Sequence, residues 1–408
     1  MKLICRECKE EYSVDDFIYR CKSCDYPLEV NYSISEESEI FNKELLRNRS
    51  WNIWRYQELL PIINQKNIIS LKEGGTPLIK ASKLGELFKL KEVYLKDETR
   101  NPTWSFKDRG TAVGVSKGLE IGAHAVGCVS SGNMAASLAA YAARAGMKGL
   151  ILVPRKTPMS KIAQMLICGG KVASIEAPYP KISHYFLKNS VEAGIYSIHA
   201  DAPMRVEGQK TVSFEVAEQL GWDIPDWLLI PTSSAGNLSA VWKGWQELNQ
   251  IGIAESKPKM GVVQAEGNSP IVRSFKKGLD YVEVNKNPET IASAIINPDP
   301  PSGKRALRIL RESRGYAETA SDKEILDAQH LLAKTEGIFA EPAASVPIAC
   351  MKKMAELGVI DANEKVVILI TGSGLKDVGT ALKTVQSPIE LKSLDEIKNF
   401  LGEISYSI

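Results

Sequence analysis

The first residue whose surroundings suggest chemistry is Lys107, in the stretch NPTWSFKDRG between Asn101 and Gly110. A lysine in a polar, glycine-lined crevice near a cation such as Arg109 has its charged form disfavoured. Its neutral amine is then available to attack a carbonyl carbon and form a Schiff base. The alternative is an ordinary solvated lysine at the start of a helix. On this stretch alone both interpretations stand.

Four short turns of small and polar residues could cradle a ligand. They are EGGTPL (73–78), SSGNMAAS (130–137), PTSSAGNLSA (231–240) and TGSGLKD (371–377). Small residues let a backbone approach an anion, and successive amide groups at the start of a helix hold it. Turns between strands and helices are commonly small and polar, so each turn alone is a weak signal. Four of them in one chain, together with Lys107, indicate a ligand site.

Four cysteines near the N-terminus have the spacing of a metal site. The pattern is CxxC, twelve residues, CxxC, and it comprises Cys5, Cys8, Cys21 and Cys24. Each CxxC turn can present two thiolates to one tetrahedral ion, and the residues between the turns suffice for a short hairpin. We predict a zinc-ribbon-like unit over residues 1–30, against the alternative of four unrelated free cysteines. The other cysteines are scattered in apolar segments, as core cysteines are: Cys128, Cys168 and Cys350.

Apolar, β-branched runs alternate with helical patterns from the end of a polar connector (36–65) to about residue 385. The predicted strands are VYLKDE, AVGCVS, GLILVP, KVASIEA, WLLIPTS, MGVVQAE and KVVILITG. Between them lie amphipathic or alanine-rich segments such as NMAASLAAYAARAG, QKTVSFEVAEQL and KEILDAQHLLAKTEG. This alternation predicts an α/β fold in which helices cover both faces of parallel sheets. Ligands bind such sheets at the carboxyl ends of strands, where the turns fall.

Composition limits the classes of partner. The chain has 408 residues, 44% hydrophobic and 25% charged, with 51 basic against 49 acidic side chains. Near-neutral charge without long like-charge runs argues against nucleic acid and anionic membranes. No run approaches the roughly 20 apolar residues that cross a bilayer, and seven cysteines, an odd number, fit a reducing compartment. We therefore expect a cytoplasmic protein whose partners are small molecules.

Five motifs resemble those of the threonine synthases. They are NPTxSFKDRG, SSGNxAASLAAYAARAG, RxEGQKT, PxxxAGN and TGxGLKD, in the family's order and approximate spacing between Trp51 and about residue 380. Threonine synthases are pyridoxal-phosphate enzymes of the tryptophan-synthase-β fold (fold type II), and the N-terminal cysteine pairs are similar to those of archaeal-type members. The resemblance implies a two-lobed fold and a homodimer. It places the large, cofactor-binding lobe at 31–120 and 206–390, the small, substrate-binding lobe at 121–205 and a tail helix at 391–408.

The resemblance also implies a role for each matched residue. Lys107 would bind pyridoxal phosphate covalently and later move the protons at Cα and Cβ of the substrate. Asn133 would hydrogen-bond the 3-hydroxyl of the cofactor ring, and Thr371 would face its pyridine nitrogen. The turn Glu341-Pro342 is similar to one near the cofactor in the family. The cofactor phosphate would lie on the backbone amides of Ser233, Ser234, Ala235, Gly236 and Asn237.

The chain departs from the family at positions expected around the substrate. The family commonly has Gly, Thr and His where this chain has Trp104, Met134 and Ser373, and an Asn-Ser pair where it has His199 and Ala200. The cofactor loop reads SSAGN instead of GNAGN. We predict that Trp104 narrows the pocket, and each lost charge-assisted hydrogen bond would cost about 1.5–3 kcal/mol of phosphate affinity. The predicted substrate-binding residues are Trp104, Ser130, Ser131, Met134, His199, Arg205, Lys210 and Ser373.

These features predict a threonine-synthase-like lyase or synthase of amino-acid biosynthesis. The family reaction converts O-phosphohomoserine to threonine, and the departures suggest another amino acid with an activated side chain. One alternative is β-replacement on an O-activated serine, as in cysteine- or cysteate-synthase relatives. A second is a non-catalytic regulator whose ribbon binds nucleic acid or a partner, but the retained Lys107 and the acidic excess in the first 30 residues argue against it.

Overall fold

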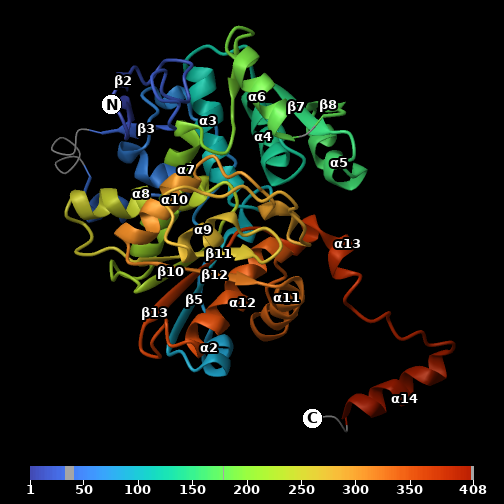
Figure 1. Ribbon diagram of the computed structural model, residues 1–408. Helices are drawn as coiled ribbons and strands as arrows, with labels where there is room; N and C mark the ends of the chain where they lie inside the picture. Colours follow the sequence, from blue (N-terminus) through green and yellow to red (C-terminus); the bar gives the residue numbers. More distant parts are fainter. Residues whose placement is uncertain (33–40, 178, 406–408) are drawn as a thin grey trace.

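The computed structural model describes residues 1–32, 41–177 and 179–405. Figure 1 shows two α/β lobes, a small N-terminal sheet against them, and a C-terminal arm that leaves the body. The chain enters its first lobe through three short 3-10 helices, η1 (Lys43–Leu46), η2 (Ile53–Leu59) and η3 (Gln65–Asn67), and a fourth, η4 (Glu98–Arg100), lies within that lobe. Among the described residues, no helix is long and apolar enough to cross a membrane.

The larger lobe is built on a six-stranded sheet of order β12-β11-β10-β13-β5-β4, parallel except for β4 at the edge. β13 is central because its run KVVILI is apolar on both faces: Ile368 and Ile370 pack into one core, and Val367 and Leu369 into another. The strands are β4 (Leu78–Lys80), β5 (Glu92–Asp97), β10 (Trp227–Pro231), β11 (Lys259–Ala265), β12 (Tyr316–Ala320) and β13 (Lys365–Ile370).

Helices cover both faces of this sheet. The core of one face includes residues of α2 (Ser82–Phe88), α11 (Asp322–Glu336) and α12 (Pro342–Glu356). The core of the other includes α7 (Pro203–Gln219), α8 (Gly236–Gln250), α9 (Pro270–Lys276) and α10 (Gly303–Glu312). A short 3-10 helix, η5 (Ser293–Ile295), precedes α10. The predicted α/β class with helices on both faces is thereby confirmed.

The smaller lobe has a four-stranded parallel sheet of order β8-β7-β6-β9. Its strands are β6 (Ala125–Val129), β7 (Lys148–Pro154), β8 (Lys171–Ile175) and β9 (Ile195–Ser197), and its helices are α3 (Lys107–Glu120), α4 (Asn133–Ala145), α5 (Met159–Ile167) and α6 (Tyr179–Ser190). α3 approaches this sheet closely because it presents glycines: a Cβ at Gly118 would lie 3.3 Å from a methyl carbon of Val126. The C-terminal half of α3 thus packs directly on this sheet.

The N-terminal unit is an antiparallel sheet of order β2-β1-β3, with strands β1 (Lys2–Cys5), β2 (Glu11–Tyr12) and β3 (Leu28–Asn31). Ion pairs join it to α10 through Arg305 and Glu29, at 2.9 Å, and to α3 through Lys117 and Asp15, at 2.6 Å. At the other end of the chain, η6 (Gly374–Lys376) and α13 (Val378–Ala381) lead to α14 (Leu394–Ser405), which Figure 1 shows away from the body.

All seven predicted strands are present, as β5, β6, β7, β8, β10, β11 and β13, and the three quoted helical segments coincide with α4, α7 and α11. Three strands of the two lobes, β4, β9 and β12, were not predicted. Two of them have only three residues, and the third, YAETA, lacks a continuous apolar run. Pairing with a neighbouring strand, a tertiary effect, makes such segments extended.

Candidate active site

Lys107 lies at the carboxyl end of the central strand β13. The backbone amide of Phe106 donates to the carbonyl of Thr371 at 3.0 Å, and the amide of Ser373 donates to the carbonyl of Trp104 at 3.0 Å. On the other side of this segment, the amide of Glu341 donates to the carbonyl of Gly372 at 3.0 Å. Three turns distant in sequence therefore meet around the lysine and Thr371, as the family motifs imply.

The helix that begins at Lys107 is anchored by buried charges. Asp108 accepts from the backbone amide and the hydroxyl of Thr103, both at 2.6 Å, and from the hydroxyl of Ser137. The guanidinium of Arg109 pairs with Glu98 at 2.7 Å and with Glu215 at 2.6 Å. The expectation that Arg109 disfavours the charged form of the lysine was therefore wrong, because two carboxylates neutralise its charge.

The Lys107 side chain is half-buried, and its amine lies 4.0 Å from the centre of the Phe106 ring. Burial, followed by the positive charge of Arg205, lowers the pKa of Lys107 to about 7, and the carboxylate of Glu341 opposes that shift. A substantial fraction of the amine is thus neutral near pH 7, as a nucleophile or base requires. The cation that tunes the lysine comes from α7, ninety-eight positions along the chain.

A buried carboxylate lies beside the predicted ring-binding residue. Glu341 accepts hydrogen bonds from the side-chain amide of Asn133 at 3.1 and 3.2 Å. Gly372 allows this approach, since a Cβ there would be 2.6 Å from a Glu341 oxygen and 3.3 Å from the Asn133 amide nitrogen. Burial raises the pKa of Glu341. Glu341 was not among the predicted site residues, although the resemblance placed the turn Glu341-Pro342 near the cofactor.

The loop 233–237 forms the start of α8. Ala235 has a left-handed backbone (φ 64°), and no side chain caps the first turn of the helix. Both polar atoms of the Asn237 side chain are buried without a hydrogen-bond partner. Unsatisfied groups at a helix N-terminus are the usual arrangement for binding an anion. The hydroxyl of Ser234, in contrast, is engaged by Asn297 at 2.6 Å.

Next to this loop, the segment 199–201 lies against Arg205. The guanidinium of Arg205 donates to the carbonyl of His199 at 2.8 Å, while its Nε is buried without a partner. Burial, and then the charges of Arg205 and Arg20, lower the pKa of His199 to about 4 against the opposing effect of Asp201. His199 is therefore neutral near pH 7, and Arg205 is the cation that remains available to an anionic ligand.

The other predicted substrate-binding residues lie in several different environments. Trp104 has a left-handed backbone (φ 66°) and a side chain that is 46% exposed. Met134 is buried in the core of the small lobe, and the Ser373 hydroxyl accepts from the amide of Leu375 at the start of η6. Ser130 and Ser131 lie just before the first residue of α4, and both are half-buried.

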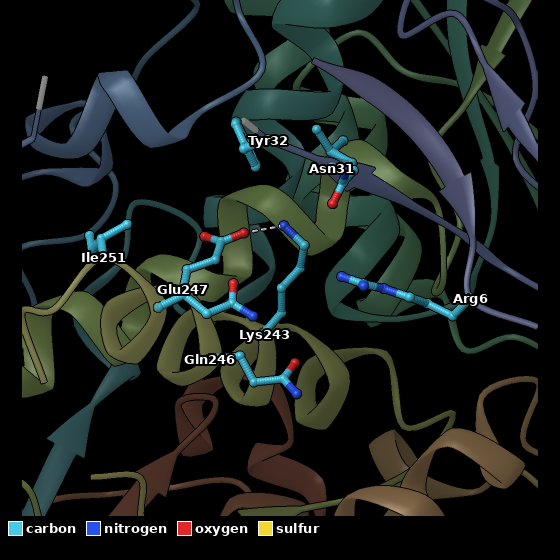
Figure 2. Close-up of a pocket in the computed structure, with 9 residues that line it drawn as sticks. Arg6, Asn31, Tyr32, Lys243, Gln246, Glu247 and Ile251 are labelled. Atoms are coloured by element: carbon cyan, nitrogen blue, oxygen red, sulfur yellow. Dashed lines mark hydrogen bonds and ion pairs between the residues drawn. The ribbon is translucent and has the colours of Figure 1, made fainter. Parts of the chain in front are cut away.

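Lys210, a predicted substrate-binding residue, lies in a buried cluster of charged side chains. Its ammonium group pairs with Glu247 at 2.7 Å and contacts Glu207, and it lies 4.1 Å from the centre of the Tyr32 ring. These contacts form a buried charge cluster with Lys243. Figure 2 shows the small hollow beside that cluster, of about 30 Å³, lined among others by Tyr32, Lys243 and Glu247. Such a volume admits water but no cofactor.

The turn EGGTPL holds an internal anion instead of a ligand. The amide of Gly75 donates to Glu215 at 2.8 Å, and the amide of Gly74 donates to Asn101 at 3.0 Å. Both glycines have positive φ and neighbours too close for a Cβ. This turn therefore supports the buried carboxylate that pairs with Arg109. Of the four predicted cradles, the remaining three lie at the starts of α4, α8 and η6.

The four N-terminal cysteines converge, with all of their sulfur atoms within 4.8 Å of one another. The Sγ of Cys5 is 3.4 Å from that of Cys24, and the Sγ of Cys8 is 3.3 Å from that of Cys21. Tetrahedral zinc with bonds of about 2.3 Å to four thiolates separates the sulfur atoms by about 3.8 Å. The donor set and its compactness fit such an ion.

The chain is similar to known proteins along nearly its whole length. The family model described as "Pyridoxal-phosphate dependent enzyme" matches residues 69–372. The threonine synthase of Methanocaldococcus jannaschii is 42% identical over 98% of this chain and 99% of its own length. That of Methanosarcina acetivorans is 42% identical over 95% of each chain. Threonine deaminase isoform 2 from Solanum lycopersicum, at 22% identity, aligns with a TM-score of 0.65 over 81% of this chain and 92% of its own, which concerns the fold alone.

Proposed function

This chain belongs to the pyridoxal-phosphate-dependent enzymes and, within them, to the threonine synthase family, and on that premise we propose that it converts O-phosphohomoserine and water into threonine and phosphate. The observation that carries this proposal is that Lys107, whose pKa is lowered to about 7, is close enough to Arg205 to feel its charge, and that Arg205 is a buried cation with an unbonded Nε. The reaction needs both a group that moves protons and a cation that binds the leaving phosphate.

The site residues fit pyridoxal phosphate. The uncapped start of α8 and the orphaned side-chain amide nitrogen of Asn237 offer donors for its phosphate. Lys107 offers an amine, while Asn133 and the buried Thr371 would contact the ring. When bound, the cofactor supplies an electron sink that stabilises negative charge at Cα of the amino acid.

The chain's own groups would then act on the substrate. With its pKa near 7, Lys107 can accept a proton from Cα and return one to a carbon of the substrate. Arg205 would bind the substrate phosphate before and after its bond to carbon breaks. Glu341 would hold the Asn133 amide in place through its hydrogen bonds. Ser130 and Ser131, at the start of α4, would contact the substrate carboxylate.

The departures from the family motifs do not require a changed substrate. Met134 contributes to the core, Ser373 closes the first turn of η6, and the Trp104 side chain is nearly half exposed. The environment of each of these three side chains is therefore explained without contact to a phosphate. Identity of 42% to two threonine synthases also supports the family reaction over β-replacement on an activated serine.

We also propose that the cysteine cluster binds one zinc ion as a structural site. Four thiolates leave no open position for a catalytic water, and two of the cysteines, Cys5 and Cys21, are buried. A homodimer remains part of the proposal on the family resemblance alone, and a cytoplasmic location remains part of it on the composition and the cysteine content.

Incubation of the purified holoenzyme with O-phosphohomoserine tests the proposed reaction. We expect threonine and phosphate in equal amounts, at rates on the order of 1 to 1000 per second, and neither product from the Lys107→Ala variant. Release of phosphate without threonine would contradict the proposal and would indicate elimination followed by loss of ammonia. Turnover of an O-activated serine in preference to O-phosphohomoserine would favour the β-replacement alternative.

A further inference from the structure

The N-terminal unit contacts the segment 199–201 directly. The guanidinium of Arg20 pairs with the carboxylate of Asp201 at 2.7 Å. The rings of Tyr19 and His199 meet edge to face, with centroids 4.8 Å apart and planes at 83°. The hydroxyl of Tyr19 also accepts from the amide of Ser197 at 2.7 Å. Two consecutive residues of the ribbon therefore hold both ends of this segment.

The same segment forms one wall of the proposed phosphate sites. Arg205 donates to the carbonyl of His199 at 2.8 Å. On the other side, a Cβ at Gly236 would be only 2.3 Å from the carbonyl oxygen of Ala200, so the start of α8 packs directly on it. Because protein interiors are close-packed, a shift of 199–201 would move both Arg205 and the first turn of α8.

The geometry of the ribbon fixes Arg20 itself. Its Nε donates to the backbone carbonyl of Asp25 at 2.9 Å and to the carboxylate of Asp25 at 3.0 Å. Asp25 follows Cys24 and has a left-handed backbone (φ 53°), so the second cysteine turn sets the position of the guanidinium. Asp201 is buried, with a side chain 5% exposed, whereas that of Arg20 is 30% exposed. The fold of the ribbon thus determines where Arg20 holds the segment 199–201, which lies beside the candidate active site.

We propose that Tyr19 and Arg20 are positioning residues for the reaction, holding 199–201 so that Arg205 and the start of α8 are aligned for the substrate phosphate and the cofactor phosphate. This inference rests on the proposed function for the identity of the substrate, but the alignment applies to any phosphate bound by Arg205. The ribbon then positions residues of the active site in addition to packing against the body of the protein. Neither residue needs to contact the substrate.

Other contacts of the ribbon provide the control. Glu7 pairs with Lys304 at 3.1 Å and with Arg308, both on α10. This attachment joins the ribbon to the body, as the Arg20 pair does, but it involves no residue of 199–201. A variant at Glu7 therefore measures the effect of weaker docking alone, and a variant at Arg20 measures docking plus positioning.

The experiment compares Arg20→Ala, Arg20→Lys and Glu7→Gln as zinc-loaded holoenzymes. We expect Arg20→Ala to raise the KM for O-phosphohomoserine about tenfold or more with a smaller change in kcat, since loss of alignment weakens phosphate binding. Arg20→Lys should recover part of that loss, and Glu7→Gln should change KM less than twofold. Equal effects of Arg20→Ala and Glu7→Gln would overturn the proposal.

Because Arg20→Ala could loosen the ribbon, Asp201→Asn removes the same ion pair from the other side. We expect a similar rise in KM with the zinc content unchanged, and no further rise in the double variant, because either single variant already removes the ion pair between Arg20 and Asp201. Losses that multiply in the double variant would overturn the proposal.

Binding of inorganic phosphate to the holoenzyme, measured by calorimetry, separates this inference from the proposed reaction. Weaker phosphate binding in Arg20→Ala than in Glu7→Gln supports positioning even if the wild-type enzyme forms no threonine. Wild-type turnover with identical phosphate binding in both variants would retain the proposed function and reject the positioning role.

Discussion

The carboxylate of Glu341 accepts two hydrogen bonds from the side-chain amide of Asn133, and both residues lie against Gly372 at the end of β13. This contact joins the two lobes at the site, since Asn133 begins α4 and Glu341 precedes α12. It also brings a negative charge near Lys107, which is otherwise affected by burial and by Arg205. Burial and two ionisable groups, Arg205 on α7 and Glu341 just before α12, thus set the charge state of the Lys107 amine.

The first prediction concerns the titration of Lys107. Its pKa of about 7 lies below the usual lysine value, so the neutral amine should become reactive as pH rises through about 7. Glu341 raises this pKa and Arg205 lowers it; Glu341→Gln should therefore shift the midpoint to lower pH and Arg205→Met to higher pH. Mass spectrometry of amine labelling in the apoenzyme measures the midpoint. A midpoint near 10 in the wild type would contradict the assignment.

The second prediction concerns the approach of the cofactor loop to Ala200. In Gly236→Ala, the new Cβ would meet the Ala200 carbonyl oxygen at 2.3 Å, and the backbone shift that relieves this contact costs about 1–3 kcal/mol. We expect affinity for pyridoxal phosphate to fall by about tenfold or more, measured from its visible absorbance during titration. Gly379→Ala, where a Cβ meets nothing within 4 Å, is the matched control. Unchanged cofactor affinity in Gly236→Ala would show that the loop does not hold the phosphate.

The third prediction concerns the backbone of Trp104. A left-handed backbone costs a non-glycine residue about 1–2 kcal/mol, and glycine loses about 0.5–1 kcal/mol in conformational entropy. Since both variants lose the indole, the free energy of unfolding of Trp104→Gly should exceed that of Trp104→Ala by about 0.5–1 kcal/mol, as measured by chemical denaturation. Trp104→Ala keeps the strain and should not be stabilised. Equal stability of the two variants would place the effect in the side chain instead.

The fourth prediction concerns the cysteine cluster. The purified protein should contain about one zinc ion per chain, and Cys8→Ser should contain almost none, because a structural site needs all four ligands. The N-terminal unit of that variant should then be cleaved faster in limited proteolysis. Cys168→Ser, which changes a cysteine outside the cluster, should retain the metal. Full zinc content in Cys8→Ser would exclude the site.

The sequence was sufficient for the seven predicted strands because these depend on local pattern. Apolar runs such as KVVILI need burial wherever they lie, and the turns after them are constrained by the change from strand to helix. The contacts between distant segments were not predictable in this way. Arg109 and Arg205 both lie in family motifs, and the sequence does not tell which of them acts on Lys107. In the structure, Glu98 and Glu215 neutralise the charge of Arg109, whereas the charge of Arg205 lowers the pKa of Lys107.

Lys210 and the turn EGGTPL show the same limit from the other direction. Lys210 belongs to a family motif and the turn was predicted to cradle a ligand, but both are used in internal ion pairs and hydrogen bonds. Which carboxylate faces which cation follows from how α7 packs on α3 and α8, a close approach that Gly208 and Gly244 permit. One sequence specifies those glycines, but their partners are known only from the fold.

The most direct test of this account is to identify the lysine that carries the cofactor. The holoenzyme is reduced with borohydride and digested, and the modified peptide is sequenced by mass spectrometry. We predict a single pyridoxyl group on Lys107, lost in Lys107→Ala. A pyridoxyl group on another lysine, or none in an enzyme that makes threonine, would contradict the assignment of this cleft as the active site.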